Sequence, residues 1–429
     1  MRFVDMKANP DAVIVRPESA QAPHEAVREI IERVVTGGDR ALLDLTERFD
    51  KVRLESLRST EDEIDRAYEE ISADLKAAMH EAARRIRSFA EHQVIQPWEA
   101  EIGGGLMGEV VFAVPRAGCY VPGGRASYPS SVLMTAIPAG VAGVEEVALC
   151  VPPAADGTLA TATLAAAKIA GVTEVYKVGG AHAIAALAYG TESIAKVDVI
   201  VGPGNIFVAT AKQQVAGLVG IDSIAGPSEI AVVTDGESDP RLVALDLIAQ
   251  AEHGPGGMSI LVTWKEEALV YVAQELEIVL AEIGASDDLR RTMELGCVGI
   301  AVRDVEQAAE CINRFAPEHL ELLFAGAEDS YRMFRHAGVI FVGEDSPVPL
   351  GDYVAGSNHV LPTGGGARWA SGLRTSHFQR ACAVVRHNRE SLWESAHHIE
   401  AFAQAEGLPN HSRAVKARFN EEIMLEQVE

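Results

Sequence analysis

Short segments rich in valine and isoleucine alternate with alanine-rich stretches from about residue 119 to residue 235, and this alternation restricts the possible folds more than any other feature. We expect the apolar segments to be strands and the alanine-rich stretches to be helices. Strands that alternate with helices form a parallel sheet covered by helices. The expected strands lie near residues 145–151, 173–178, 196–201 and 229–234.

A second region with the same alternation follows, and helical sequence flanks both regions. Residues 22–95 have a helical pattern, with a capped, acidic start at residues 59–63 for a long amphipathic run to about His92. The polar sequence beyond residue 374 is expected to be helical. In the second region we expect helices at 240–253 and 265–283 and strands near 258–263, 297–302 and 338–342.

The length of the chain requires more than one domain. Its 429 residues exceed the roughly 250 to 300 at which a single hydrophobic core stops growing. The sequence therefore predicts an α/β protein with two Rossmann-like domains built on parallel sheets, together with small helical elements near each terminus.

Charge and composition exclude several classes of partner. The net charge of −25 disfavours binding to nucleic acid or to anionic lipid. Pro138 and the pair Glu145–Glu146 interrupt the most apolar stretch, and residues 1–5 do not begin a secretory signal. The five cysteines are odd in number, scattered and without a CxxC pair, which is typical of buried, reduced thiols. We expect a cytoplasmic protein with no nucleic-acid or membrane partner.

Glycine-rich turns mark candidate ligand sites. Residues 103–108 match GxGxxG but precede a strand, so we interpret them as a hairpin or linker and not as a phosphate loop. The turns at 178–182, 201–205 and 225–229 adjoin expected strands, where glycine admits close approach of a ligand to the backbone. Each turn has an alternative as simple chain geometry, but three together favour a nucleotide or another large ligand.

Two histidine-bearing segments carry candidate chemistry. Gln250 and His253 lie three residues apart, before Gly254–Pro255 ends a helix, and so share the face on which two donors bind a metal. The alternative is a helix C-terminus with a histidine stabilised by the helix dipole. Glu318 and His319 follow Pro317, in a turn or a first helical turn, and supply two groups suited to different proton transfers. Their alternative is an acidic helix start with a surface histidine.

Two further segments combine carboxylates with imidazoles. Residues 351–359 form a polar loop flanked by glycine, in which Asp352 is a candidate oxygen ligand for a metal and His359 a candidate substrate contact. Glu406 and His411 end the C-terminal helical stretch with another such pair.

Taken together, these segments resemble the histidinol dehydrogenase family over nearly the whole chain. The resemblance rests on long motifs in one order, which are far more specific than any single motif. They are Cys119–Arg125, Tyr128–Met134, Gly202–Asn205, Ala225–Glu229, Gln250–Pro255, Pro317–Leu320 and Asn358–Thr363.

The resemblance implies a zinc- and NAD-dependent enzyme that oxidises L-histidinol to L-histidine through L-histidinaldehyde with two NAD+. It implies one zinc ion per subunit, and an intertwined homodimer in which a second subunit supplies His411 and Glu406. Glu318 and His319 become the proton-transfer pair: His319 removes the alcohol proton, and Glu318 activates the water that attacks the aldehyde. The implied zinc ligands are Gln250, His253, Asp352 and His411. The implied substrate contacts are Ser228, Gln250, His253, His319, Asp352, His359, Glu406 and His411.

The family's cofactor contacts fall on Tyr120, His182 and Asn205. Here the sequence departs from the family, which commonly has glutamine where this chain has His182. Both side chains donate hydrogen bonds, but imidazole is shorter and can titrate. We expect His182 to contact NAD and to alter either the affinity or its pH dependence.

The resemblance also suggests how the domains divide. We expect an N-terminal extension, a first α/β domain with the helical wrapper and the metal and catalytic segments, an NAD-binding α/β domain, and a C-terminal helical dimerisation element. The boundaries are, in that order, 1–17, then 18–118 with 235–373, then 119–234, then 374–429.

Two alternatives to this function stay open from the sequence. The first is a related zinc- and NAD-dependent dehydrogenase of another small alcohol, such as a sulfonated diol. The motifs around Glu318 and Ser228 favour the histidinol branch, and Glu406 suits an amine better than a sulfonate. The second is a non-catalytic binding protein stabilised by zinc, in which Glu318 and His319 have no role.

Overall fold

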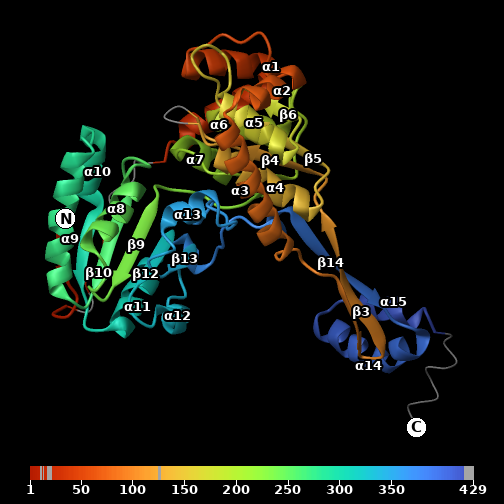
Figure 1. Ribbon diagram of the computed structural model, residues 1–429. Coiled ribbons are helices and arrows are strands. Elements are labelled where there is room, and N and C mark those ends of the chain that lie inside the picture. The colour runs from red at the N-terminus through yellow and green to blue at the C-terminus, as the bar shows by residue number, and fades with distance from the viewer. Residues whose placement is uncertain (10–11, 13, 17–21, 124–126, 420–429) are drawn as a thin grey trace. The chain divides into compact units, whose positions relative to one another are not determined.

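The computed structural model describes residues 1–9, 12, 14–16, 22–123 and 127–419. The chain forms two compact units, drawn in Figure 1: Met1–Val94 with Ala113–Phe378, and Ile95–Phe112 with Gln379–Glu429. The first unit holds two parallel sheets and their helices. No helix in the described part of the chain is long and apolar enough to cross a membrane.

The first parallel sheet has five strands in the order β6-β5-β4-β7-β8. Its strands are buried on both faces, which explains their nearly continuous apolar sequence. Helices α4 and α5 cover one face, and α6 and α7 cover the other. The strands are β4 (Arg116–Tyr120), β5 (Glu146–Cys150), β6 (Glu174–Tyr176), β7 (Val199–Val201) and β8 (Gly220–Ile221). The helices are α4 (Pro129–Ala142), α5 (Thr161–Ala170), α6 (Gly180–Tyr189) and α7 (Ile206–Val215).

Three N-terminal helices form an outer layer over this five-stranded sheet: α1 (His24–Asp50), α2 (Glu61–Glu70) and α3 (Ala73–Glu91). They pack on α6, α5 and α4, respectively. The expected cap is confirmed, because Thr60 and Glu63 bond reciprocally at the start of α2. The single long helix to His92 is wrong, since the chain is extended at Ile71 and Ser72 and the Ser72 hydroxyl caps α3.

The second parallel sheet has six strands in the order β1-β11-β10-β9-β12-β13. Helices α8, α9, α10 and α13 share one apolar layer with the sheet, while α11 and α12 pack on the other face. The strands are β1 (Arg2–Asp5), β9 (Glu229–Thr234), β10 (Met258–Thr263), β11 (Cys297–Ala301), β12 (His319–Leu323) and β13 (Val339–Val342). The helices are α8 (Pro240–Ala251), α9 (Glu266–Glu282), α10 (Asp287–Gly296), α11 (Val305–Phe315), α12 (Ala327–Ser330) and α13 (Val348–Tyr353).

All seven strands expected from the sequence overlap strands of these two sheets. The grouping of segments differs from the expected division, however. The helices of residues 24–91 cover the five-stranded sheet, whereas the expected division grouped them with residues 235–373. Arg2–Asp5 is an edge strand paired with β11 and not a separate extension. Short 3₁₀ helices lie at Tyr331–Met333, Gly366–Arg368 and Thr375–Phe378.

The second compact unit joins a three-stranded sheet, in the order β14-β3-β2, to two helices. The expected hairpin is confirmed: β2 and β3 pair antiparallel, and Gly103 and Gly104 turn between them at φ of 59° and 72°. The expectation of helix throughout residues 374–429 is wrong for β14, which is a strand. The elements are β2 (Trp98–Ile102), β3 (Gly105–Ala113), β14 (Gln379–Arg386), α14 (Arg389–Ala405) and α15 (Pro409–Lys416).

A buried ion pair holds the turn after β7. The side chains of Lys212 and Asp222 are each 2% exposed and pair with one another. Lys212 Nζ also donates to the carbonyl of Gly202 at 3.0 Å, and Asp222 Oδ2 accepts from the Gly202 amide at 2.8 Å. Gly202 has φ of 117°, and a Cβ there would lie 2.0 Å from the carbonyl oxygen of Tyr120. The pair therefore fixes a turn that only glycine can form.

We expect Lys212→Met to lower the free energy of unfolding by about 3–5 kcal/mol, because it leaves the Asp222 carboxylate buried without its cation. Denaturant-induced unfolding measures the effect. The matched control is Lys168→Met, since Lys168 pairs with Asp65 where both side chains are at least half exposed. That change should cost less than about 1 kcal/mol. Equal losses in the two variants would contradict this interpretation.

Candidate active site

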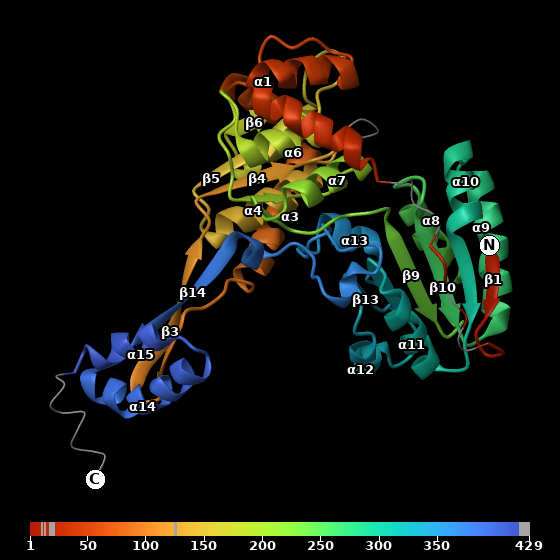
Figure 2. The same cartoon turned by 180° about the vertical axis from the view of Figure 1, so that it is seen from behind.

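Glu318 and His319 lie at the amino end of β12, between β9 and β13. Because the strands are parallel, this end of β12 lies beside the amino end of β9, where His319 pairs in register with Ile230. Figure 2 labels β9 and β13, the two strands that flank β12. The expectation of a turn or a first helical turn is therefore wrong, since His319 begins a strand. Both side chains are buried, with Glu318 6% and His319 4% exposed. The surface-histidine alternative is excluded.

The backbone of Glu229 holds both side chains. Its amide donates to Glu318 Oε2 at 2.9 Å, and its carbonyl lies 3.1 Å from His319 Nδ1. Because the carbonyl only accepts, Nδ1 carries the proton and donates it. His319 also stacks on Phe341, with ring centroids 6.3 Å apart. These contacts fix the tautomer and the plane of the ring.

Two carboxylates flank the His319 ring. Glu318 Oε2 lies 3.5 Å from Nδ1, and Asp352 Oδ1 lies 3.8 Å from Nε2. Burial by itself lowers the pKa of His319, but the two carboxylates outweigh burial and raise it to about 10. In return, the charge of His319 lowers the pKa of Asp352 against the opposing effect of burial. Nε2 has no hydrogen-bond partner among the described residues.

The end of α8 brings two more candidate ligands. Gln250 lies in its last turn and is 3% exposed, and the described residues provide no acceptor for its Nε2. His253 lies in the following turn, where its amide donates to the Gln250 carbonyl at 3.2 Å, and it is exposed. The helix expected to reach residue 253 ends at Ala251, so His253 does not share a helical face with Gln250, and Gly254 follows with φ of 119°. His253 is near enough to Asp352 to help lower its pKa.

Asp352 lies in the last turn of the short helix α13, not in a loop as expected. Its carbonyl accepts from His359 Nδ1 at 3.1 Å, and His359 Nε2 lies 3.0 Å from the Ser131 hydroxyl. Burial lowers the pKa of His359, so this ring is neutral and accepts from Ser131. Ser228 is half-buried and comes directly before β9. Glu318, His319, Asp352 and His359 thus form one contact network.

The first compact unit contains three of the four expected metal ligands, and the fourth, His411, belongs to the second unit. In the ranges that the structure describes, no three His, Cys, Asp or Glu side chains form a metal-binding group. Of the three expected ligands, His253 and Asp352 are of those types and Gln250 is not, so this set does not count as such a group. An amide oxygen, an imidazole and a carboxylate are together suited to zinc. The buried Gln250 amide without a partner is the kind of group that a ligand satisfies.

Glu406 and His411 belong to the second compact unit. Glu406 caps the end of α14, and His411 lies in the first turn of α15 with its amide bonded to the Leu408 carbonyl at 3.0 Å. In the single chain, both side chains are accessible to solvent on the surface of the second compact unit.

The expected cofactor residues lie at the carboxyl edge of the five-stranded sheet. Tyr120 ends β4, and its hydroxyl accepts from the Gly180 amide at 3.1 Å. Asn205 follows β7 and caps α7 through its side-chain oxygen. Strand order reverses between β4 and β7, and ligands of open α/β sheets bind at the carboxyl edge beside such a reversal.

His182 is 2% exposed in the first turn of α6. Its Nε2 lies 3.4 Å from the Thr46 hydroxyl, and its ring lies beside Phe49 of α1. Burial lowers its pKa to about 3, so this imidazole is neutral at physiological pH. Its Nδ1 is buried without a partner in the described chain. A change of charge on His182 is therefore not expected near neutral pH, and the contact of His182 with NAD stays a prediction.

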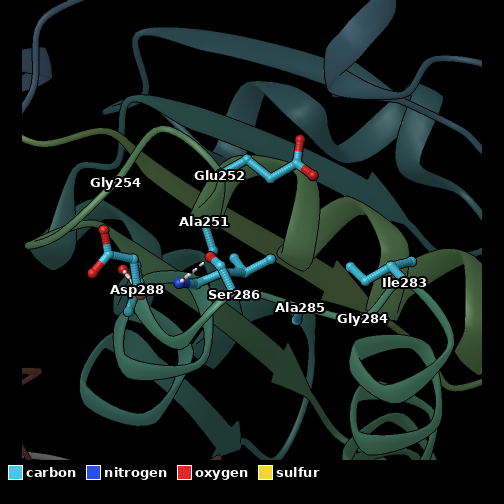
Figure 3. A pocket seen from close by; sticks show the side chains of 10 residues that line it. Ala251, Glu252, Gly254, Ile283, Gly284, Ala285, Ser286 and Asp288 are labelled. Carbon is cyan, nitrogen blue, oxygen red and sulfur yellow. Dashed lines mark hydrogen bonds between the residues drawn. The ribbon is translucent and has the colours of Figure 1, made fainter. Parts of the chain in front are cut away.

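One cavity among the described residues is lined by other side chains. It holds about 340 Å³ and is lined by the end of α8 and the start of α10, including Glu252, Ser286 and Asp288 (Figure 3). None of the predicted site residues lines it.

Sequence reasoning missed the Glu229 backbone and Ser131, because a contact that depends on the fold leaves no signal in the spacing of residues.

Comparison with known proteins identifies one family. The family model described as histidinol dehydrogenase matches residues 15–419. A histidinol dehydrogenase of Methanothermobacter thermautotrophicus is 43% identical over 396 residues, which cover 92% of this chain and 93% of the relative. One from Geobacillus kaustophilus is 45% identical over 394 residues, with coverage of 92% and 93%.

A solved structure agrees in fold. The crystal structure of histidinol dehydrogenase from Elizabethkingia anophelis has a TM-score of 0.93 and 34% sequence identity, and the match covers 97% of this chain and 98% of that one. The predicted α/β fold with parallel sheets is thereby confirmed, and so is the resemblance seen in the motifs. The chain belongs to the histidinol dehydrogenase family.

Proposed function

We propose that this chain catalyses the four-electron oxidation of L-histidinol to L-histidine through L-histidinaldehyde, the last steps of histidine biosynthesis. Family membership makes it an NAD-dependent oxidoreductase, and two NAD+ accept the two hydrides. The observation that carries the proposal is the buried pair Glu318–His319 beside Asp352. A cytoplasmic location is consistent with this biosynthetic role and stays a prediction.

His319 is proposed to take the proton of the substrate alcohol as hydride leaves the carbinol carbon. The Glu229 carbonyl holds Nδ1 protonated, so in the neutral ring Nε2 is the atom that accepts the proton from the alcohol. Glu318 then removes a proton from the water that attacks the aldehyde. The second hydride leaves the resulting hydrate, and the product is a carboxylate.

Zinc is proposed to bind to Gln250, His253 and Asp352, with His411 from a second subunit as the fourth protein ligand. When bound, the ion supplies a Lewis acid that orients the imidazole and the amine of the substrate. Glu406 from the second subunit is suited to pair with the substrate ammonium. Ser228, which directly precedes Glu229, and His359, which contacts the Asp352 carbonyl, are proposed as further substrate contacts. Sharing of His411 and Glu406 requires the homodimer that the family resemblance implies.

NAD is proposed to bind at the carboxyl edge of the five-stranded sheet, in contact with Tyr120, His182 and Asn205. The reversal of strand order between β4 and β7 supports this placement. The turn after β6 also begins α6, whose amino end favours a phosphate.

We expect Glu318→Gln to slow oxidation of L-histidinaldehyde about 10²- to 10⁴-fold while preserving the first hydride transfer, because the amide cannot take a proton from water. NADH formed from L-histidinol and from L-histidinaldehyde is measured separately. The control is Glu328→Gln, an exposed position in α12. A normal rate of aldehyde oxidation in Glu318→Gln would remove Glu318 from this role.

The same assay separates the alternative functions. The family match does not favour either a dehydrogenase of sulfonated diols or a non-catalytic zinc protein. Absence of NADH with L-histidinol, NAD and zinc, together with NADH from a sulfonated diol, would support the first. Absence with both substrates would support the second.

We expect His182→Ala to raise the KM for NAD about tenfold, which corresponds to the loss of one hydrogen bond. His182→Gln is the matched control and should stay near the wild-type value, because an amide also donates. Since the pKa of His182 is lowered to about 3, the ring is already neutral above that pH, and the KM should show no His182 titration between about pH 5 and pH 8. An unchanged KM in His182→Ala would refute the contact.

Subunit mixing tests the sharing of His411. We assume that His411 of one subunit completes the site that holds Glu318 of the other. A heterodimer of His411→Ala with Glu318→Gln then contains one intact site and one doubly altered site. Formation of L-histidine should then recover to about half of the wild-type value per dimer, although each parent homodimer forms L-histidine only slowly. No recovery in isolated heterodimers would mean that His411 acts within its own subunit.

A further inference from the structure

A second buried carboxyl group lies under the active site. Glu321 follows His319 by two residues in β12, so the two side chains lie on one face of the sheet. Its neighbours in register are Val232 and Phe341, and it is 1% exposed within the apolar layer between the sheet and α8. The proposed mechanism gives this carboxyl group no role. A buried acid in such surroundings requires specific partners.

The two carboxyl oxygens of Glu321 have different surroundings. Oε1 accepts from the amide of Val348 at 2.8 Å, and Val348 is the first residue of α13. Oε2 is buried and receives no hydrogen bond from any described residue. The Asp246 carboxyl group of α8 lies close enough for the two groups to change one another's pKa. Two ionised carboxylates only accept, so this contact becomes a hydrogen bond only when one of them is protonated.

The proton belongs on Glu321. Burial, and then the charge of Asp246, raise the pKa of Glu321 to about 8, while burial raises that of the less enclosed Asp246 to about 6. The other ionisable group that acts on this pair is His319 in β12, whose charge lowers the pKa of Glu321. With one shared proton, Glu321 accepts from Val348 and donates to Asp246, and both of its oxygens are satisfied.

We propose that Glu321 and Asp246 share one proton, and that this pair positions the three segments that carry the active site. The segments are the start of β12, the end of α8 and the helix α13. Asp246 lies one turn before Gln250 on the same face of α8, and α13 carries Asp352. The assignment of these segments to catalysis rests on the proposed function. Glu321 is thus a positioning residue and does not touch substrate.

The physical consequence concerns the geometry of the site. The Val348 amide is at the start of a helix and has no acceptor within that helix. Without Glu321, the start of α13 loses one hydrogen bond to β12, and Asp246 of α8 loses the proposed hydrogen bond to the same strand. Displacement of reacting groups by about 1 Å costs on the order of 10²-fold in rate.

The test compares two substitutions of similar size in the full-length enzyme. Glu321→Gln reproduces the protonated acid, since its amide accepts from Val348 and donates to Asp246. Glu321→Leu removes both hydrogen bonds. We expect Glu321→Gln to keep kcat within about threefold of wild type and Glu321→Leu to lower it roughly 10- to 100-fold. The thermal midpoint of each variant shows that it is folded.

Infrared difference spectra supply a measurement that does not depend on activity. At neutral pH, wild type should show the carbonyl stretch of a protonated carboxylic acid, and Glu321→Gln should lack it. Absence of that band from wild type, or an equal loss of kcat in the two variants, would overturn the shared proton. Full activity in Glu321→Leu would overturn the positioning role.

These results are distinguishable from failure of the proposed function. If wild type forms no NADH from L-histidinol, the proposed function fails, whereas the infrared band still reports on the pair. If wild type is active and Glu318→Gln behaves as expected while Glu321→Leu is fully active, only the positioning role fails.

Discussion

Parallel pairing of β9 with β12 determines the surroundings of the proton-transfer pair. The pairing of His319 with Ile230 places the Glu229 backbone beside Glu318 and His319, where it donates to one side chain and accepts from the other. A shift of register by one residue would turn His319 to the opposite face of the sheet. It would also separate Glu321 from α8 and α13. The chemistry of the site therefore depends on one strand register.

The two sheets use opposite edges. The expected NAD residues lie at the carboxyl edge of the five-stranded sheet, as is usual for open α/β sheets. Glu318 and His319 lie at the amino edge of the six-stranded sheet, where α8 ends and returns to β10. The Ser131–His359 contact links α4 to the segment after α13, and His359 in turn contacts Asp352. The rule that ligands bind at carboxyl edges therefore points to the expected NAD residues and not to Glu318 and His319.

The sequence predicted the parts of this fold whose signal is local. The strands at residues 229–234 and 258–263 agree with β9 and β10, because continuous apolar runs between turns leave little ambiguity. β12 was missed, because Pro317 followed by Glu318 and His319 has the composition of a helix start, and Glu321 breaks the apolar run. Asp246 and Glu321 are 75 residues apart in sequence, so no spacing rule brings them together. The roles of the site residues came from long motifs shared with a family.

The site contains more carboxyl groups than cationic side chains, and this excess of negative charge determines the protonation state of His319. Arg16 neutralises the buried Glu229, and the proton proposed between Glu321 and Asp246 removes a second charge. Glu318 and Asp352 are left beside His319, and they are the reason that its pKa is raised to about 10. At that value the imidazole is protonated and cannot act as a base. A cation held by Asp352 would withdraw one of these carboxylates and return the His319 pKa toward the range in which the ring accepts a proton. If a cation binds there, the acidity of the site would link cation binding to the proposed proton transfer by His319.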